Sequence, residues 1–323
     1  MKGDKTTAVR YLTTMNLQDT VRQGSTFQNL ELLARQVVEG FISGMHKSPF
    51  HGFSAEFAEH KIYNPGESTR HIDWKLFAKT DKLYTKRYDE ETNLRCHLIL
   101  DNSASMHYPA VKQLEVDNLN KLGFSALAIA SIMRLMKKQR DAVGLSIYGE
   151  DYEYYAPEKG NDRHHAMLLE QLQQRLDGEA TTTRTRTPEI LHQIAENIHR
   201  RSLIFLFTDL FVPGEPYEDL VEALRHLKHN KHEVVLFNIH DGATEMEFDF
   251  SNRPTKFVDV ETGDTVNLYA NNVKEQYKRA VTEYYNAVKE VCIQYRIKYV
   301  PVDLRQSLDQ VLLTFLIERQ KFA

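Results

Sequence analysis

The sequence has few of the features that mark secreted, membrane-bound or disulfide-linked proteins. Only two of its 323 residues are cysteines, and Cys96 and Cys292 lie far apart in apolar surroundings. This favours buried thiols in a reducing compartment over a disulfide. The first residues include no apolar signal core, and the longest apolar stretch, 123–136, contains Arg134 and is shorter than the roughly 20 residues of a membrane span. We therefore expect a cytoplasmic protein with no segment inserted in a membrane.

A strong charge of one sign is also missing. The formal net charge is −4, and hydrophobic residues make up 41% of the chain, which is an ordinary balance for a globular protein. Such a balance argues against nucleic acid as the partner. No G-x-x-x-x-G-K-[ST] motif is present, so we expect no ATP hydrolysis by a P-loop in this chain.

Three regions differ in their hydrophobic pattern, and the length suits one large or two modest domains. Residues 1–25 are polar and are expected to form a flexible N-terminus. Residues 26–92 begin with an amphipathic helix from Leu30 to Phe41 and continue with a stretch punctuated by proline and glycine. We expect this second region to form a small lobe of loops and short strands.

The third region, 93–323, has the pattern of a mostly parallel sheet covered by helices on both faces. Apolar strand segments alternate there with helical segments, which predicts a Rossmann-like α/β fold. The expected strands are 95–101, 141–148, 152–156, 202–208, 233–239 and 298–302, with a further small hairpin within 245–266. The expected helices are 111–139, 164–176, 188–199, 217–229, 271–294 and a last helix near 308–316.

Polar side chains follow two of these strands at the point where each ends. The segment "ILDNSASM" places Asp101, Ser103 and Ser105 on alternate positions, and "LIFLFTDL" ends at Asp209. In parallel α/β sheets, ligands bind beyond the carboxyl ends of the strands. If the two strands are neighbours, both carboxylates face the same crevice.

Three interpretations of the first segment compete. A serine nucleophile is disfavoured because the segment has no G-x-S-x-G motif and no obvious His/Asp pair serves it. An aspartyl-phosphate enzyme of the haloacid-dehalogenase type resembles D-x-D, but Ser103 stands at the third position, where the acid–base partner belongs. A magnesium site fits best, since hydroxyl and carboxylate oxygens are hard ligands and Asp101 can orient them from the outer shell. A phosphohydrolase using Asp101, and a site that folds without metal, remain open alternatives.

A loop rich in threonine and arginine, "GEATTTRTRTPEILHQI" (178–194), offers a further hydroxyl ligand. Thr187 stands directly before Pro188 and is interpreted as a helix cap. Arg184 and Arg186 either attract an acidic partner segment or belong to a solvated loop.

The order D-x-S-x-S, threonine loop and T-D resembles the von Willebrand factor A-type domain with its metal-ion-dependent adhesion site. "TRTPEIL" is similar to that family's T-x-T-G-x-A-L, with proline in place of glycine, which selects Thr185 and leaves Thr183 possible. The resemblance implies a site for Mg²⁺ (or Mn²⁺) built from Asp101, Ser103, Ser105, Thr185 and Asp209.

Residues 50–91 resemble the hallmark of the domain of unknown function 58 family. The match consists of Gly52-Glu56-Phe57, the turn Tyr63–Glu67, and R-x-I-D-W-x-x-x-A from Arg70 to Ala78. In that family the block precedes an A-type domain, and together the two parts cover about 44–316. The block is interpreted as structural, with Trp74 as a packing anchor. Arg70 and Asp73 either form a local pair or tie the small lobe to the sheet domain. A partner-docking surface is the alternative.

The resemblance also implies a function. Members of that family are commonly encoded beside MoxR-type AAA+ ATPases in bacteria and archaea. We therefore expect a non-enzymatic adaptor, in which a partner's Asp or Glu fills an open position on the ion. The expected partners are such an ATPase, which would supply the ATP hydrolysis, and its clients in protein maturation or remodelling.

Overall fold

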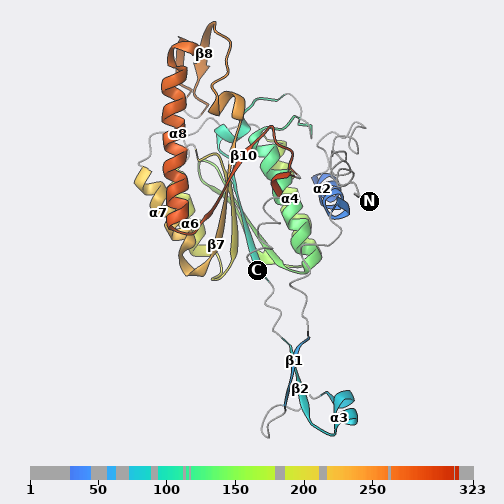
Figure 1. Ribbon diagram of the computed structural model, residues 1–323. Coiled ribbons are helices and arrows are strands. Elements are labelled where there is room, and N and C mark those ends of the chain that lie inside the picture. The colour runs from blue at the N-terminus through green and yellow to red at the C-terminus, as the bar shows by residue number, and fades with distance from the viewer. Residues whose placement is uncertain are drawn as a thin grey trace, which may run out of the picture.

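The protein is described here by a computed structural model (Figure 1). The described residues are 30–44, 57–62, 73–88, 94–111, 114–115, 118–178, 186–210, 217–260, 263–308 and 310–312. The N-terminus 1–25, Arg70, Thr183, Arg184 and Thr185 lie outside them.

A six-stranded sheet forms the centre of the molecule, in the order β10-β7-β6-β3-β4-β5. Every neighbouring pair is parallel except β4 and β5, which are antiparallel. The inner strands are buried on both faces, which explains why segments such as "LIFLFT" are apolar at every position. The strands are β3 (Arg95–Asp101), β4 (Ala142–Tyr148), β5 (Tyr152–Lys159), β6 (Leu203–Thr208), β7 (Glu233–His240) and β10 (Lys298–Asp303). The predicted mostly parallel α/β sheet is confirmed.

Helices cover both faces of this sheet and divide the hydrophobic core in two (Figure 1). One face packs against α2 (Leu30–Gly44), α4 (Lys121–Gln139) and α5 (Asp162–Leu176), with α2 lying outside α4. The other face packs against α6 (Thr187–Asn197), α7 (Tyr217–Lys228) and α8 (Ala270–Gln294). Both cysteines are buried free thiols, as the sequence predicts. None of the described helices combines the length and the apolar composition required to cross a bilayer.

Two small hairpins stand outside this sheet. β8 (Pro254–Val258) pairs with β9 (Thr265–Tyr269), so the hairpin overlaps the expected region 245–266 but begins later and extends three residues past its end. β1 (Phe57–Ile62) pairs with β2 (Tyr84–Tyr88), and α3 (Trp74–Thr80) lies between them in sequence. These elements agree with the expected short strands of the N-terminal lobe.

The packing role expected for Trp74 is wrong. Its side chain is 62% exposed, and α3 has no buried residues against which an indole could pack. Its ring contact is an edge-on approach to Phe77, with ring centroids 6.2 Å apart. Asp73 caps α3, since its carboxylate accepts hydrogen bonds from the backbone N–H groups of Lys75 and Leu76.

Helix α4 begins ten residues later than the sequence pattern predicts, at Lys121 instead of 111. Asn120 has an extended backbone, and its side-chain oxygen accepts a hydrogen bond from the N–H of Gly123 at 2.7 Å. This cap stops the helix from extending upstream. The backbone N–H of Lys121 bonds instead to the carbonyl of Tyr108 at 3.0 Å, which closes the loop that follows β3.

Helix α6, in contrast, begins one residue earlier than predicted, at Thr187 instead of 188. The capping position is Arg186, whose side chain makes no capping hydrogen bond, and Thr187 is the first helical residue and is buried. Thr187 is therefore not the cap. Pro188, next in the chain, suits the first turn because backbone N–H groups there have no acceptor within the helix, so proline's lack of an N–H costs no hydrogen bond.

We expect Asn120→Ala to lower the free energy of unfolding by about 1 kcal/mol, because the first turn of α4 then loses its capping acceptor. Urea denaturation followed by circular dichroism measures the change. Asn161→Ala is the matched control, since Asn161 caps α5 through the N–H of His164 in the same way. An unchanged urea midpoint for Asn120→Ala, with a shifted midpoint for the control, would contradict the assigned cap.

Candidate functional site

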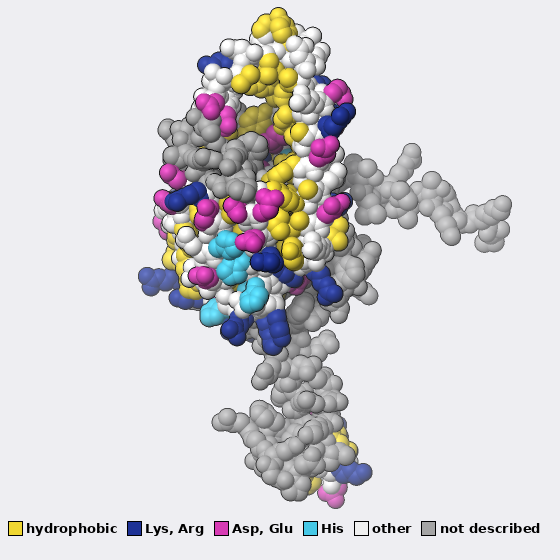
Figure 2. Space-filling view, turned by 90° about the vertical axis from the view of Figure 1, so that its left-hand side faces the viewer, with side chains coloured by type: hydrophobic (Ala, Val, Ile, Leu, Met, Phe, Trp, Pro, Cys, Tyr) yellow, Lys and Arg dark blue, Asp and Glu magenta, His cyan; other side chains and the backbone are white. Residues whose placement is uncertain are grey.

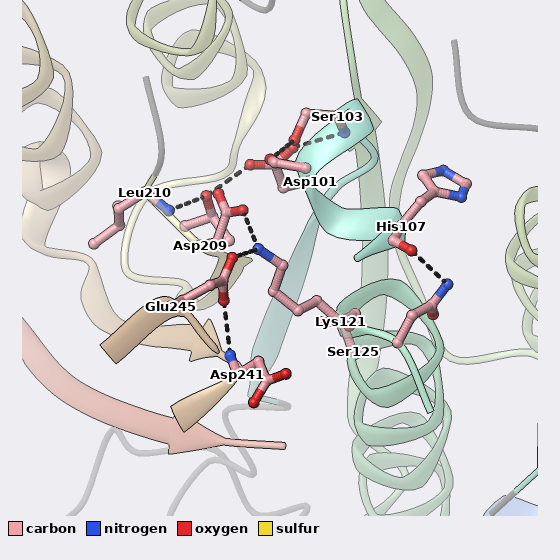
Figure 3. Close-up of polar contacts among 12 residues, drawn as sticks. Asp101, Ser103, His107, Lys121, Ser125, Asp209, Leu210, Asp241 and Glu245 are labelled. Atoms are coloured by element: carbon pink, nitrogen blue, oxygen red, sulfur yellow. Dashed lines mark hydrogen bonds and ion pairs between the residues drawn. The ribbon is translucent and has the colours of Figure 1, made fainter. Parts of the chain in front are cut away.

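Asp101 and Asp209 lie at the same edge of the sheet, at the carboxyl ends of two adjacent strands (Figure 3). Asp101 is the last residue of β3, and Asp209 directly follows β6. Ser103 and Ser105 lie in the turn after β3, which includes the short 3₁₀-helix η3 (Ala104–His107). The structure thus brings four of the five residues selected from the sequence to one edge, and all four side chains are buried.

The carboxylate of Asp101 is held by three hydrogen bonds. One oxygen accepts from the backbone N–H of Ser103 at 2.9 Å. The other accepts from the hydroxyls of Thr208 at 2.7 Å and Tyr148 at 3.1 Å. Burial and the nearby charge of Asp209 raise the pKa of Asp101 to about 6, against the lowering effect of the hydrogen bonds from Thr208 and Ser103. With both oxygens engaged, Asp101 is suited to fixing the turn rather than to attacking a substrate.

The hydroxyls of Ser103 and Ser105 face each other, with 3.1 Å between their oxygens. Two oxygen ligands that sit at right angles on a magnesium ion, each about 2.1 Å from it, are separated by about 3 Å. The serine pair therefore has the spacing of adjacent ligands on a small hard cation. No three His, Cys, Asp or Glu side chains cluster for metal binding in the described ranges, so a cation at this edge depends on hydroxyls.

Lys121 supplies a buried positive charge at this edge. Its side chain is 1% exposed, and its ammonium donates hydrogen bonds to Asp209 at 2.7 Å and to Glu245 at 2.6 Å (Figure 3). Burial alone lowers the pKa of Lys121, but the charges of Asp209 and Glu245 outweigh it and raise the pKa above its ordinary value. The ammonium is therefore charged at neutral pH, and it is held between two carboxylates.

Glu245 reaches the site from the turn after β7. This turn, η5 (Gly242–Met246), is capped by Asp241, whose carboxylate accepts hydrogen bonds from the N–H of Ala243 and the hydroxyl of Thr244. The second oxygen of Glu245 accepts from the N–H of Asp241 at 2.7 Å, and burial raises the pKa of Glu245. Tyr108, in the loop after β3, donates to Thr244 at 2.8 Å. The turns after β3 and β7 are thereby tied together.

The backbone beyond Asp209 has an unusual conformation. Leu210 has φ = 58°, in the left-handed region that costs a residue with a Cβ about 1 kcal/mol or more. The N–H of Leu210 donates to the hydroxyl of Thr208 at 3.0 Å. Tyr284 and Tyr285 of α8 donate to the carbonyls of Leu210 at 2.8 Å and Asp209 at 3.3 Å. These contacts hold the turn that orients Asp209.

Three contributors to the site were missed in the sequence: Lys121, Tyr148 and Glu245. Thr208 was noticed only as the first residue of the T-D pair, without its hydrogen bond to Asp101. Lys121 left one detectable signal, because it stands alone before the apolar segment "LGFSALAIASIM". Nothing in the sequence around Glu245 or Tyr148 distinguishes either of them. Arg186, considered as an attractor for an acidic partner, is exposed and lies 3.3 Å from Asp151.

A family model described as "Protein of unknown function DUF58" matches residues 59–287. Uncharacterised proteins of Mycobacterium bovis and Mycobacterium tuberculosis are 28% identical over 90 residues, which is 28% of this chain and 28% of each of theirs. The match thus spans little more than a quarter of these relatives.

Two solved structures are similar at low identity. The protein BatB from Bacteroides thetaiotaomicron is 15% identical with a TM-score of 0.41, covering 71% of this chain and 100% of that one. An aerotolerance-related membrane protein from Bacteroides fragilis is 16% identical with a TM-score of 0.40, and the similarity covers 70% of this chain and 99% of that one. Similarity at this level establishes no shared function.

Proposed function

The chain belongs to the DUF58 family, and we propose that it is a non-enzymatic adaptor that recognises an acidic residue of a partner protein through a hard divalent cation, Mg²⁺ or Mn²⁺. We further propose that its α/β domain is of the von Willebrand factor A type. The partner we propose is a MoxR-type AAA+ ATPase, acting on its clients in the cytoplasm.

The observation that carries this proposal is the pair of buried serine hydroxyls 3.1 Å apart beside a rigid carboxylate. Ser103 and Ser105 would hold the ion, while Asp101 fixes their turn by accepting the N–H of Ser103. Asp209 adds negative charge from the neighbouring strand. When bound, the ion supplies a positively charged coordination position that suits a partner's carboxylate.

The alternative function, a phosphohydrolase with Asp101 as nucleophile, is less well supported. Both oxygens of Asp101 accept hydrogen bonds, and the side chain is 2% exposed. A nucleophile needs an approachable oxygen and a nearby general acid or base. Glu245 and Asp209 carry carboxylates here, but each accepts a hydrogen bond from Lys121.

An exposed apolar surface on the β8–β9 hairpin supports a role in protein binding. Val258, Val260, Val266 and Tyr269 are each 39–55% exposed, and Figure 2 shows yellow apolar side chains at the top of the molecule, where the hairpin lies. Exposed apolar patches commonly mark protein interaction sites. Glu245 lies in the turn that leads into β8, so the site and this surface share one segment of the chain.

Calorimetric titration with Mg²⁺ and Mn²⁺ tests the ion site. We expect the double variant Ser103→Ala/Ser105→Ala to bind at least about tenfold more weakly than the unaltered protein, because two of its hydroxyl ligands are gone. Ser131→Ala is the matched control, since Ser131 is a buried serine of α4 whose hydroxyl donates to the carbonyl of Leu127. Equal affinity of the double variant and the control would contradict the assigned ligands.

Two further measurements test the function. We expect a purified MoxR-type AAA+ ATPase to be captured by this protein in the presence of Mg²⁺ and released by EDTA. Turnover of generic phosphoester substrates with Mg²⁺, abolished by Asp101→Ala, would overturn the adaptor and favour the hydrolase.

A further inference from the structure

We propose that Lys121 is a tethered competitor of the divalent ion for Asp209, so that the lysine sets how weakly the site binds the ion. This inference rests on the proposed function, because it concerns the regulation of the same site. It assigns to Lys121 a regulatory role, and Lys121 is not itself a ligand of the ion.

The first argument is positional. The ammonium of Lys121 lies 2.7 Å from an oxygen of Asp209, the strand-end acid next to Asp101. A hard cation at the serine pair is attracted by the same carboxylate. Both cations therefore draw on the charge of one acid, and their like charges repel each other.

The second argument is that Lys121 is built into the site. Its backbone N–H donates to the carbonyl of Tyr108, and its carbonyl accepts from the hydroxyl of Ser125 at 2.8 Å. The main chain is thus fixed at the start of α4, and the ammonium is held in place by Asp209 and Glu245. An ammonium shielded from water keeps a strong electrostatic effect on its neighbours.

The third argument is the charge balance of the edge. Ionised Asp101, Asp209 and Glu245 carry three negative charges, of which Lys121 neutralises one. Replacing the ammonium with an apolar group of similar length removes this compensating positive charge. The negative potential at the serine pair then increases, which favours a divalent cation.

Calorimetric titration with Mg²⁺, and with Mn²⁺ followed by electron paramagnetic resonance of the free ion, tests the inference on the full chain. We expect Lys121→Met to bind either ion about tenfold more tightly. We expect Glu245→Gln to bind more weakly than the unaltered protein, because it leaves Lys121 with Asp209 as its remaining carboxylate partner among these contacts. Lys137→Met is the control, since Lys137 lies on the same helix but pairs with Asp162, away from the site.

The outcomes separate the inference from the proposed function. Ion binding by the unaltered protein, with equal or weaker binding by Lys121→Met, overturns the inference and leaves the adaptor standing. Binding by Lys121→Met alone supports the inference and overturns the adaptor's ion site, and no binding by either overturns both. If Lys121→Met does not fold, the test of the inference is the affinity of Glu245→Gln for the ion. Tighter binding by Glu245→Gln than by the unaltered protein overturns the inference.

Discussion

A Lys121→Met variant is expected to lose about 3–5 kcal/mol of unfolding free energy when divalent cations are absent, because two carboxylates then lose their shared cation. The side chain of Asp209 is 2% exposed and cannot recover the loss by hydration, whereas that of Glu245 is 27% exposed and regains some water. Domains are commonly stable by about 5–15 kcal/mol, so we expect the variant to remain folded. Urea denaturation in EDTA at neutral pH measures the loss.

A double-mutant cycle with Asp209→Asn separates the ion pair from the packing of the lysine stem. Combining Lys121→Met with Asp209→Asn is expected to cost less than the sum of the two single changes, because Lys121→Met alone takes the ammonium away from the buried Asp209 carboxylate, whereas the double variant removes both charges of this pair. Lys137→Met, which breaks an exposed pair with Asp162, is expected to cost less than about 1 kcal/mol. Additive costs in the cycle would show that Lys121 and Asp209 are not coupled.

These two residues also explain how much of the site the sequence could reveal. Asp101, Ser103 and Ser105 stand on alternate positions within five residues, so their spacing alone groups them. Asp209 could be added because carboxyl ends of parallel strands share one edge. Lys121 is separated from Asp209 by 88 positions in the sequence and from Glu245 by 124. Local sequence patterns do not predict contacts between residues so far apart.

The fold was predictable where the period of apolar residues decides the structure. The inner strands are apolar throughout because both faces of the sheet are covered, and this pattern alone predicts a mostly parallel sheet. The start of α4 was not predictable from periodicity, because the cap at Asn120 and the bond from Lys121 to Tyr108 set it. The exposure of Trp74 was missed for a similar reason, since composition does not reveal that α3 lacks a packing partner.

The second large effect is expected from His97, at the centre of β3. Its side chain is fully buried, with one ring nitrogen 2.8 Å from the carboxylate of Glu158 on β5 and the other 2.7 Å from the hydroxyl of Ser146 on β4. Gly144 makes room for the ring, because a Cβ at that position would lie 2.6 Å from the ring nitrogen. His97 therefore ties three strands together, including the antiparallel edge strand β5.

We expect His97→Ala to lower the free energy of unfolding by about 3–5 kcal/mol at pH 7, because it leaves the shielded carboxylate of Glu158 without its partner and opens a cavity. Urea denaturation measures the loss. Arg175→Ala is a useful control, because the Arg175–Glu153 ion pair is partly exposed and its loss is expected to cost about 1 kcal/mol or less. A loss below 1 kcal/mol for His97→Ala would contradict the role assigned to the pair.

The acid side of the stability profile provides an independent check on the same pair. Burial raises the pKa of Glu158, but the hydrogen bond and charge of His97 outweigh burial and lower the pKa below its ordinary value. A carboxyl group with a lowered folded pKa stabilises the protein above its unfolded pKa of about 4.3, and this contribution is lost as the pH falls through the folded value. Glu158→Gln is therefore expected to flatten the decline in stability below about pH 4.3, and an unchanged decline would show that other carboxylates cause it.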